Sequence, residues 1–175
     1  RIMAELGITK IKLTGGEPLL HVRMPELVEQ IKAIPGIKKV TLTTNGILLK
    51  DQMAKLAEAG LDAVNVSLDT RSRECFQKIA RKDSLDQSLE GIKEALRYPE
   101  VSVKINCVPL GIQGQDICQV AELAKEHPVH VRFIEMMPIG CGTEFHGMSE
   151  KELTDILEAE FGPLKVYQGE PLGNG

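Results

Sequence analysis

The sequence has few of the residues that bind long nucleic acids. It contains no tryptophan, its aromatic residues make up 3% of the chain, and its formal net charge is −4. Binders of long DNA or RNA usually carry a basic excess and stacking aromatics. We therefore expect no long nucleic acid partner. A single nucleotide stays compatible with this composition, because a few cationic groups suffice to hold a triphosphate.

Long apolar runs, a signal peptide and closely spaced cysteines are also absent. No stretch approaches the ~20 apolar residues that a membrane span needs, so we expect no membrane partner. The cysteines are widely spaced, without a C-x-x-C pair, at Cys75, Cys107, Cys118 and Cys141. This spacing excludes zinc-ribbon and ferredoxin-like sites. We interpret the cysteines as reduced thiols of a cytoplasmic protein.

Short runs rich in β-branched residues alternate with amphipathic segments along the chain. The period-2 pattern predicts strands at 10–14, 39–43, 63–68, 101–108 and 129–134. The 3.6-residue period predicts helices at 25–34, 51–59, 73–79, 85–96, 116–125 and 150–161. Repeated β-α units of this kind favour an α/β fold with a parallel sheet and right-handed crossovers.

Polar residues follow each predicted strand, which favours a barrel over an open doubly wound sheet. A barrel gathers its site from successive strand ends, whereas a Rossmann sheet uses one G-x-G-x-x-G turn, and that turn is absent here. Lys104 and Asn106 are spaced to share one face of their strand. We predict a partial (β/α) TIM-like barrel arc over residues 1–160, and a linker or the start of another region over 161–175.

The first residues read as the end of a helix, because Arg1–Leu6 is closed by the cap glycine Gly7. We therefore expect that the chain is truncated at both ends. A missing first strand would leave an open sheet edge and an uncovered apolar face. Such a chain would associate through those exposed edges. A native homodimer is left open.

The segment Thr14-Gly15-Gly16-Glu17-Pro18 follows the first predicted strand. Adjacent glycines let a ligand approach the backbone, whose carbonyls can accept hydrogen bonds from an ammonium group. The alternative is an ordinary turn in which Thr14 and Glu17 form a capping box.

This motif resembles the G-G-E-P motif of radical S-adenosylmethionine (SAM) enzymes. Further blocks follow in the order of one family within that group, the GTP 3',8-cyclases of molybdenum cofactor biosynthesis, and the resemblance covers about residues 1–160. These blocks are Leu42-Thr43-Thr44-Asn45-Gly46, Asn65-Val66-Ser67-Leu68-Asp69, Val103-Lys104-Ile105-Asn106 and Arg132-Phe133-Ile134-Glu135-Met136-Met137-Pro138-Ile139-Gly140.

The resemblance implies SAM-dependent radical conversion of GTP to 3',8-cyclo-7,8-dihydro-GTP, with the side chains acting as positioning groups. It assigns SAM contacts to the residues Gly15, Gly16, Glu17, Ser67 and Met137. It assigns GTP contacts to the residues Lys12, Thr43, Lys104 and Arg132. Cationic groups suit a triphosphate, and hydroxyl groups suit ribose, base or carboxylate groups.

The family needs [4Fe-4S] clusters, and the cysteine triads that hold them do not occur in this sequence. We predict no metal ligands in this chain, and no GTP cyclisation by it alone. Of its cysteines, Cys107 is expected to line the chamber. The family usually has arginine where Lys12 stands, and Arg23 is expected to approach a phosphate.

Two other functions remain open on the sequence. One is a different radical SAM enzyme, of a peptide-maturing or haem pathway, because G-G-E-P is shared across that superfamily. The other is a non-catalytic nucleotide-binding barrel domain. The first would lack GTP affinity, and the second would bind phosphate without regard to SAM.

Overall fold

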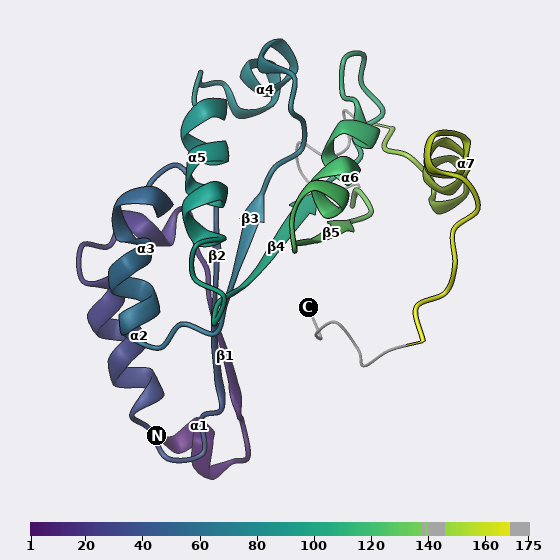
Figure 1. Cartoon of the computed structure of the whole chain (residues 1–175). Coiled ribbons are helices and arrows are strands. Elements are labelled where there is room, and N and C mark those ends of the chain that lie inside the picture. The colour runs from purple at the N-terminus through teal and green to yellow at the C-terminus, as the bar shows by residue number, and fades with distance from the viewer. Residues whose placement is uncertain (138, 140–145, 169–175) are drawn as a thin grey trace.

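The computed structural model describes residues 1–137, 139 and 146–168. A single five-stranded parallel sheet runs through them in the order β1-β2-β3-β4-β5 (Figure 1). A doubly wound sheet reverses its strand order at a switch point, whereas a barrel wall follows the chain. The predicted barrel arc is therefore confirmed. The strands are β1 (Lys10–Leu13), β2 (Lys39–Thr44), β3 (Ala63–Ser67), β4 (Ser102–Cys107) and β5 (His130–Phe133).

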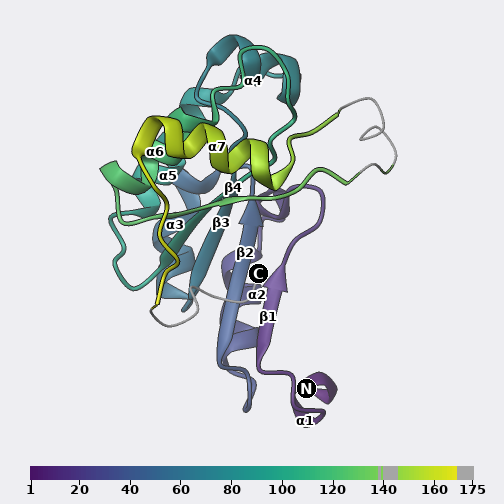
Figure 2. The ribbon, with the colours of Figure 1, turned by 90° about the vertical axis from the view of Figure 1, so that its right-hand side faces the viewer.

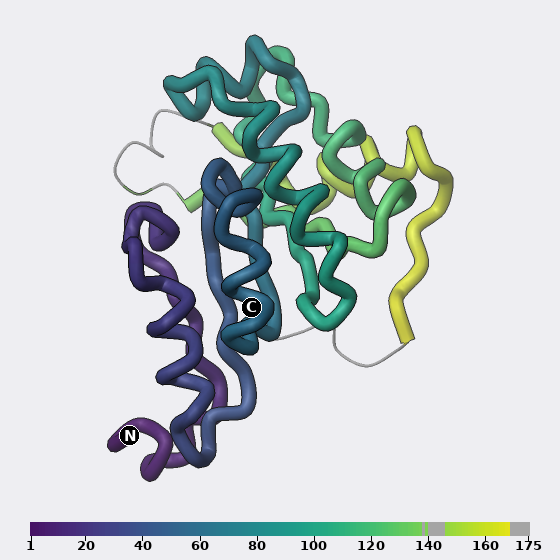
Figure 3. The backbone as a smooth tube through the Cα atoms, turned by 60° about the vertical axis from the view of Figure 1, so that its left-hand side comes forward, coloured from purple at the N-terminus to yellow at the C-terminus, as the bar shows by residue number. Residues whose placement is uncertain are grey.

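Helices connect consecutive strands, and one further helix precedes β1 and another follows β5. They are α1 (Ile2–Glu5), α2 (Met24–Lys32), α3 (Leu49–Glu58), α4 (Arg73–Ala80), α5 (Leu85–Ala95), α6 (Ile117–Glu126) and α7 (Glu150–Phe161), with one short 3-10 helix, η1 (Pro18–Leu20). Figure 1 shows α2, α3 and α5 on one side of the sheet, and Figure 2, in which the right-hand side of Figure 1 faces the viewer, shows β1, β2 and β3 in front of them. The tube in Figure 3 shows α2, α3 and α5 as a row that follows the order of the chain.

Alternation along the strands places the hydrophobic core under the helices. In β2, Val40 and Leu42 are fully buried, and in β3 Val64 and Val66 are as well. They pack with apolar side chains from α2, α3, α5 and α6 in one core cluster. Because side chains on a strand point alternately to the two faces, every second residue of these strands must face away from the helices.

That second face of the sheet, here called the open face, is polar. The register places the following residues side by side on it: Lys10, Lys12, Lys39, Thr41, Thr43, Asn65, Ser67, Lys104, Asn106 and Arg132. The open face collects cations and hydrogen-bonding groups, because alternation assigns the apolar residues of the strands to the helix side. Just before β1, the apolar residues Ile2, Met3, Leu6 and Ile8 are exposed. Association through uncovered apolar surface and open edges stays a prediction.

The helix predicted at the start of the chain is present as α1. Its end is closed as the pattern indicated, with Gly7 at φ 88° and its amide bonded to the carbonyl of Ala4 at 3.0 Å. No helix within the part of the chain that the structure describes is long and apolar enough to span a membrane.

Candidate functional site

The glycine turn after β1 is open to a ligand. Gly15 has a φ of 154°, a conformation that side chains rarely adopt, and both Gly15 and Gly16 are exposed. A Cβ added to either glycine would meet nothing within 4 Å. The backbone carbonyls of this turn can therefore be reached by a hydrogen-bond donor such as an amino group.

Glu17 faces the end of β2. It is the N-cap of η1, and its carboxylate also accepts hydrogen bonds from the Thr44 hydroxyl at 2.6 Å and the Asn45 amide at 2.8 Å. The alternative of a capping box between Thr14 and Glu17 was wrong, because Glu17 itself caps the 3-10 helix. This carboxylate joins the ends of two strands.

A hydrogen-bonded network crosses the open face from β2 to β5. The Oδ1 atom of Asn106 accepts two bonds from the Arg132 guanidinium, from Nε at 3.1 Å and from Nη2 at 2.8 Å. The same Nη2 donates to Oδ1 of Asn65 at 3.3 Å. The Nδ2 group of Asn65 lies 3.5 Å from the Thr43 hydroxyl oxygen, at the limit of a hydrogen bond. Two amide side chains thus orient one guanidinium.

Lys104 lies on the open face next to this network. Its register partners are Asn65 on β3 and His130 on β5. Partial burial lowers the pKa of Lys104, and the nearby charges of Arg132 and then of Lys39 and other lysines lower it further. Crowded cations of this kind favour an anionic ligand, whose charge would offset their repulsion.

Of the other predicted contact residues, one lies at the end of a strand, one beyond a strand and one within a strand. Ser67 is the exposed last residue of β3 and lies opposite Asn106 in the register. Met137 lies in the coil after β5 and is 68% exposed. Lys12 is exposed on β1, opposite Thr41 on the open face.

Two residues of the site were not singled out from the sequence. Asn65 is 4% exposed and contacts Arg132, which lies 67 positions further along the chain. Asn65 lies two residues before Ser67 and therefore on the same face of the strand, and this spacing could have identified it from the sequence. Thr44 is 2% exposed and bonds Glu17, and nothing in the local pattern distinguishes it from an ordinary strand residue.

The described cysteines do not form an iron–sulfur site. Cys107 is fully buried on the helix side of β4, so its predicted place in the chamber was wrong. Burial raises the pKa of this thiol to about 12, and the Asp69 charge adds to the effect, which disfavours the thiolate that a cluster requires. Among the described residues no group of three or more His, Cys, Asp or Glu could hold a metal ion. Cys141 lies outside the described residues.

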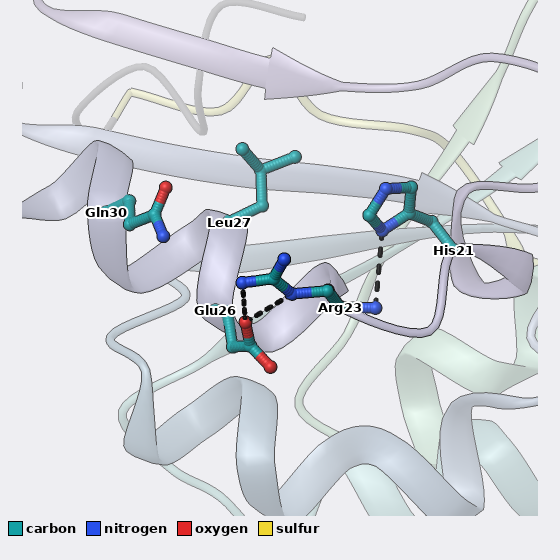
Figure 4. Close-up of a pocket in the computed structure, with 5 residues that line it drawn as sticks. All are labelled: His21, Arg23, Glu26, Leu27 and Gln30. Carbon is teal, nitrogen blue, oxygen red and sulfur yellow. Dashed lines mark hydrogen bonds and ion pairs between the residues drawn. The ribbon is translucent and has the colours of Figure 1, made fainter.

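Arg23 lies in a different hollow, beside α2. This cavity of about 300 Å³ is lined by His21, Arg23, Glu26, Leu27 and Gln30 (Figure 4). The guanidinium of Arg23 forms an ion pair with Glu26 at 2.6 Å, and its amide donates to Nδ1 of His21. Nothing described joins Arg23 to the open face, so its predicted approach to a phosphate gains no support from this arrangement.

Relatives in sequence carry names from one area of metabolism. A GTP 3',8-cyclase of Clostridium perfringens (strain 13 / Type A) is 44% identical over 158 residues, which cover 90% of this chain and 49% of that protein. A GTP 3',8-cyclase of Chlorobaculum tepidum is 48% identical over 138 residues, covering 78% and 42%. Molybdenum cofactor biosynthesis protein 1 of Dictyostelium discoideum is 33% identical over 170 residues, covering 95% and 27%. The chain thus spans about half the length of the bacterial relatives or less.

Solved structures with the same fold include methylornithine synthase, with a TM-score of 0.65 and 20% identity over 90% of this chain and 50% of that one. A domain of the pyruvate-formate lyase-activating enzyme from Bacteroides vulgatus has a TM-score of 0.62 and 17% identity, covering 87% of this chain and 94% of that one. The family model described as the radical SAM superfamily matches residues 1–130. The chain has the glycine turn and a parallel sheet in chain order, and the family model matches most of its length. The chain therefore belongs to the radical SAM superfamily.

Proposed function

We propose that this chain forms the central barrel region of a GTP 3',8-cyclase of molybdenum cofactor biosynthesis, with residues 1–160 as the barrel part and 161–175 as a linker. GTP would bind on the open face and SAM at the carboxyl ends of β1 and β3. The proposal is supported by the names of relatives that are 44% and 48% identical. It is also supported by the positions of the contact residues that the family resemblance implies.

One observation carries the GTP part of the proposal: the Arg132 guanidinium is held by Asn65 and Asn106 beside Lys104. A guanidinium whose plane is fixed loses less entropy on forming charge-assisted hydrogen bonds with a phosphate. The pKa of Lys104 is lowered by burial and by neighbouring cations, so an anion beside it would offset that repulsion. Thr43 adds a hydroxyl for a ribose or base at the β2 side of the face.

The glycine turn fits the amino-acid part of SAM, because its exposed backbone leaves room where any other residue would place a Cβ. Ser67 would offer a hydroxyl from the end of β3, and Met137 an exposed apolar surface for a purine ring. Bound SAM supplies the radical chemistry in this superfamily. The residues of this chain would bind and orient the two molecules, and would limit the access of water to them.

The described residues do not fit the [4Fe-4S] cluster that radical SAM enzymes use. Cys75 and Cys107 are buried, and Cys118 lies on a different helix from Cys75. We therefore assign no step of the reaction to these thiols. Cluster ligands would have to come from residues other than the described ones.

The test is nucleotide binding to the chain, measured by calorimetry. We expect Lys104→Ala and Arg132→Ala each to weaken GTP binding about tenfold, since each removes a charge-assisted bond worth roughly 1.5 kcal/mol. Lys151→Ala serves as the control, because it removes one exposed charge that lies on α7 and not on a strand of the sheet. Equal GTP affinities in all variants would contradict the proposed site.

The same titrations separate the competing functions. A GTP 3',8-cyclase region should bind GTP in preference to ATP, and should also bind SAM. A radical SAM protein of another pathway would bind SAM without GTP preference. A non-catalytic nucleotide-binding barrel domain would bind phosphate compounds without any response to SAM or to changes in the glycine turn.

A further inference from the structure

Both carboxylate oxygens of Glu17 are used by donors of its own chain. Its Oε1 accepts hydrogen bonds from the Thr44 hydroxyl at 2.6 Å and the Leu19 amide at 3.0 Å. Its Oε2 accepts one from the Asn45 amide at 2.8 Å. We infer that Glu17 is a positioning residue that fastens the Gly15–Gly16 turn to the end of β2 and is not itself a SAM ligand; its effect on SAM rests on the proposed function.

The end of β2 is a fixed point to which a turn can be fastened. Thr44 is 2% exposed, and its hydroxyl oxygen also accepts a bond from the Gly46 amide at 3.1 Å. The carbonyl of Asn45 accepts a bond from the Ser88 hydroxyl on α5 at 2.9 Å. Glu17 thus bonds Thr44 and Asn45, and the turn at these residues is itself bonded to α5 on the helix side.

The glycine turn needs such an attachment because it has no side chains of its own. Gly15 and Gly16 are exposed, and no atom lies within 4 Å of where their Cβ atoms would be. Glycine loses the most conformational entropy on ordering, so an unfastened turn would sample many states before binding. Glu17 is the first residue after the glycines with a side chain, and its bonds restrict the turn before a ligand arrives.

Glutamine cannot replace this carboxylate. An amide has one oxygen and one NH₂ group, whereas both positions of Glu17 face donors. Whichever way the amide turns, a donor would face a donor. Thr44→Val removes the hydroxyl from the other side of the same link while keeping the shape of the side chain, and Thr44→Ser keeps the hydroxyl.

The experiment is a double-mutant cycle on the whole 175-residue chain, with Glu17→Gln, Thr44→Val and the combination. Urea unfolding without ligand should show each single change lowering the midpoint by roughly 0.5–1 M, with the double change lowering it by little more than one of them. Equilibrium dialysis with labelled SAM, at a temperature where all variants are folded, should show each single change weakening SAM binding about tenfold. The double change should weaken SAM binding no further than either single change. Thr44→Ser, which keeps the hydroxyl, should bind SAM as the unaltered chain does.

Glu152→Ala is the control for lost stability. Oε2 of Glu152 accepts bonds from the amide and the hydroxyl of Ser149 at 2.9 and 2.7 Å, so removing the carboxylate removes a pair of contacts at the start of α7. We expect it to lower the urea midpoint without changing SAM affinity. A loss of SAM affinity in this control equal to that of Glu17→Gln would reduce the role of Glu17 to general stability and overturn the inference.

Two other outcomes would overturn the inference. The first is an additive effect of the two changes on ligand-free unfolding, which would mean that Glu17 and Thr44 act separately. The second is weaker SAM binding in Glu17→Gln with unchanged binding in Thr44→Val, which would make the carboxylate a direct ligand. If the unaltered chain binds no SAM, the proposed function fails, while the ligand-free cycle still decides whether Glu17 fastens the turn.

Discussion

The surroundings of some residues near the strand ends shift the pKa values of those residues. Burial raises the pKa of Asp69 above its ordinary value of 3.8, against the opposing effect of the hydrogen bond from the Val108 amide at 2.8 Å. Ionising this carboxyl therefore costs more in the folded chain than in the unfolded one. Its contribution to stability is present at low pH and is lost as the pH rises through the raised pKa.

We predict that Asp69→Asn leaves the urea midpoint at pH 7 equal to or above that of the unaltered chain. The asparagine Oδ1 can still accept the bond from Val108, and no buried charge remains to be desolvated. The difference between the two chains should vanish below pH 3.8, the ordinary pKa of the carboxyl, because both side chains are then neutral. A clearly lower midpoint for the variant at pH 7 would contradict this account.

Lys104 gives a second residue-scale prediction, which rests on the proposed GTP site. Its pKa is lowered from 10.5, first by burial and then by the charge of Arg132. GTP should prefer the charged form, so GTP affinity should begin to fall while the pH is still below 10.5. Lys104→Arg stays charged, and calorimetry across this range should show a flatter profile, with a difference of about tenfold at its upper end.

The stability of the ligand-free chain should change with pH in the direction opposite to the change in GTP affinity. The folded chain releases the Lys104 proton at lower pH than the unfolded chain does, so stability should rise with pH in the same interval. A GTP affinity that depends on pH to the same degree in Lys104→Arg would show that other groups control binding.

At the scale of elements, α5 packs closely on the turn between β2 and α3. A Cβ on Gly91 would lie 2.2 Å from the Gly46 carbonyl oxygen and 3.1 Å from the Leu49 Cβ. Alanine usually stabilises a helix by about 1 kcal/mol relative to glycine. Here the contact is with backbone, which cannot move aside, and overpacking costs roughly 1–3 kcal/mol or more. The steric cost should outweigh the gain in helix propensity.

We therefore predict that Gly91→Ala lowers the free energy of unfolding by about 2 kcal/mol, measured by urea unfolding. Gln87→Ala, on the exposed side of the same helix, is the control and should be neutral or slightly stabilising. A stabilising Gly91→Ala would mean that α5 can shift away from the turn without loss.

The elements themselves were largely predictable from the sequence. Each predicted strand and helix is present, because period and β-branched content are local properties of the chain. The boundaries differ where a side chain caps a helix: α6 starts at Ile117 because Asp116 accepts bonds from the Cys118 and Gln119 amides. The 3-10 helix Pro18–Leu20 was not predicted, since three residues are too few to show a period.

At the scale of the whole molecule, the open face is a cationic surface on one side of the sheet. Lys10, Lys12, Lys39, Lys104 and Arg132 lie on it, although the chain has a net charge of −4. Inorganic tripolyphosphate should therefore raise the thermal midpoint of the chain. At about 100 times its dissociation constant, the ligand would add roughly 2.7 kcal/mol of stability.

Added salt should reduce that gain, because it screens exposed charges. Spermine, a cation of similar flexibility, is the control and should produce no increase in the midpoint. An equal response to both compounds, or no response to tripolyphosphate, would show that the open face does not act as an anion site.

The candidate site was predictable only in part. The strand ends with Gly15, Gly16 and Ser67, and the shared face of Lys104 and Asn106, follow from position along a strand. The place of Cys107 was predicted wrongly, because neighbouring residues of a strand face opposite sides and the helix side holds this thiol. Whether the residues assigned to SAM and GTP contact those molecules stays a prediction.

The sequence by itself determined the alternation of strands and helices, the polar residues at the strand ends and the glycine turn, because each depends on a few neighbouring residues. Only the tertiary structure decided that Glu17 bonds Thr44 and that Arg132 bonds both Asn65 and Asn106. These partners are separated by 26 to 67 positions, and the register of parallel strands brings them together. Register depends on how the whole sheet packs against its helices, and a local pattern does not contain that information.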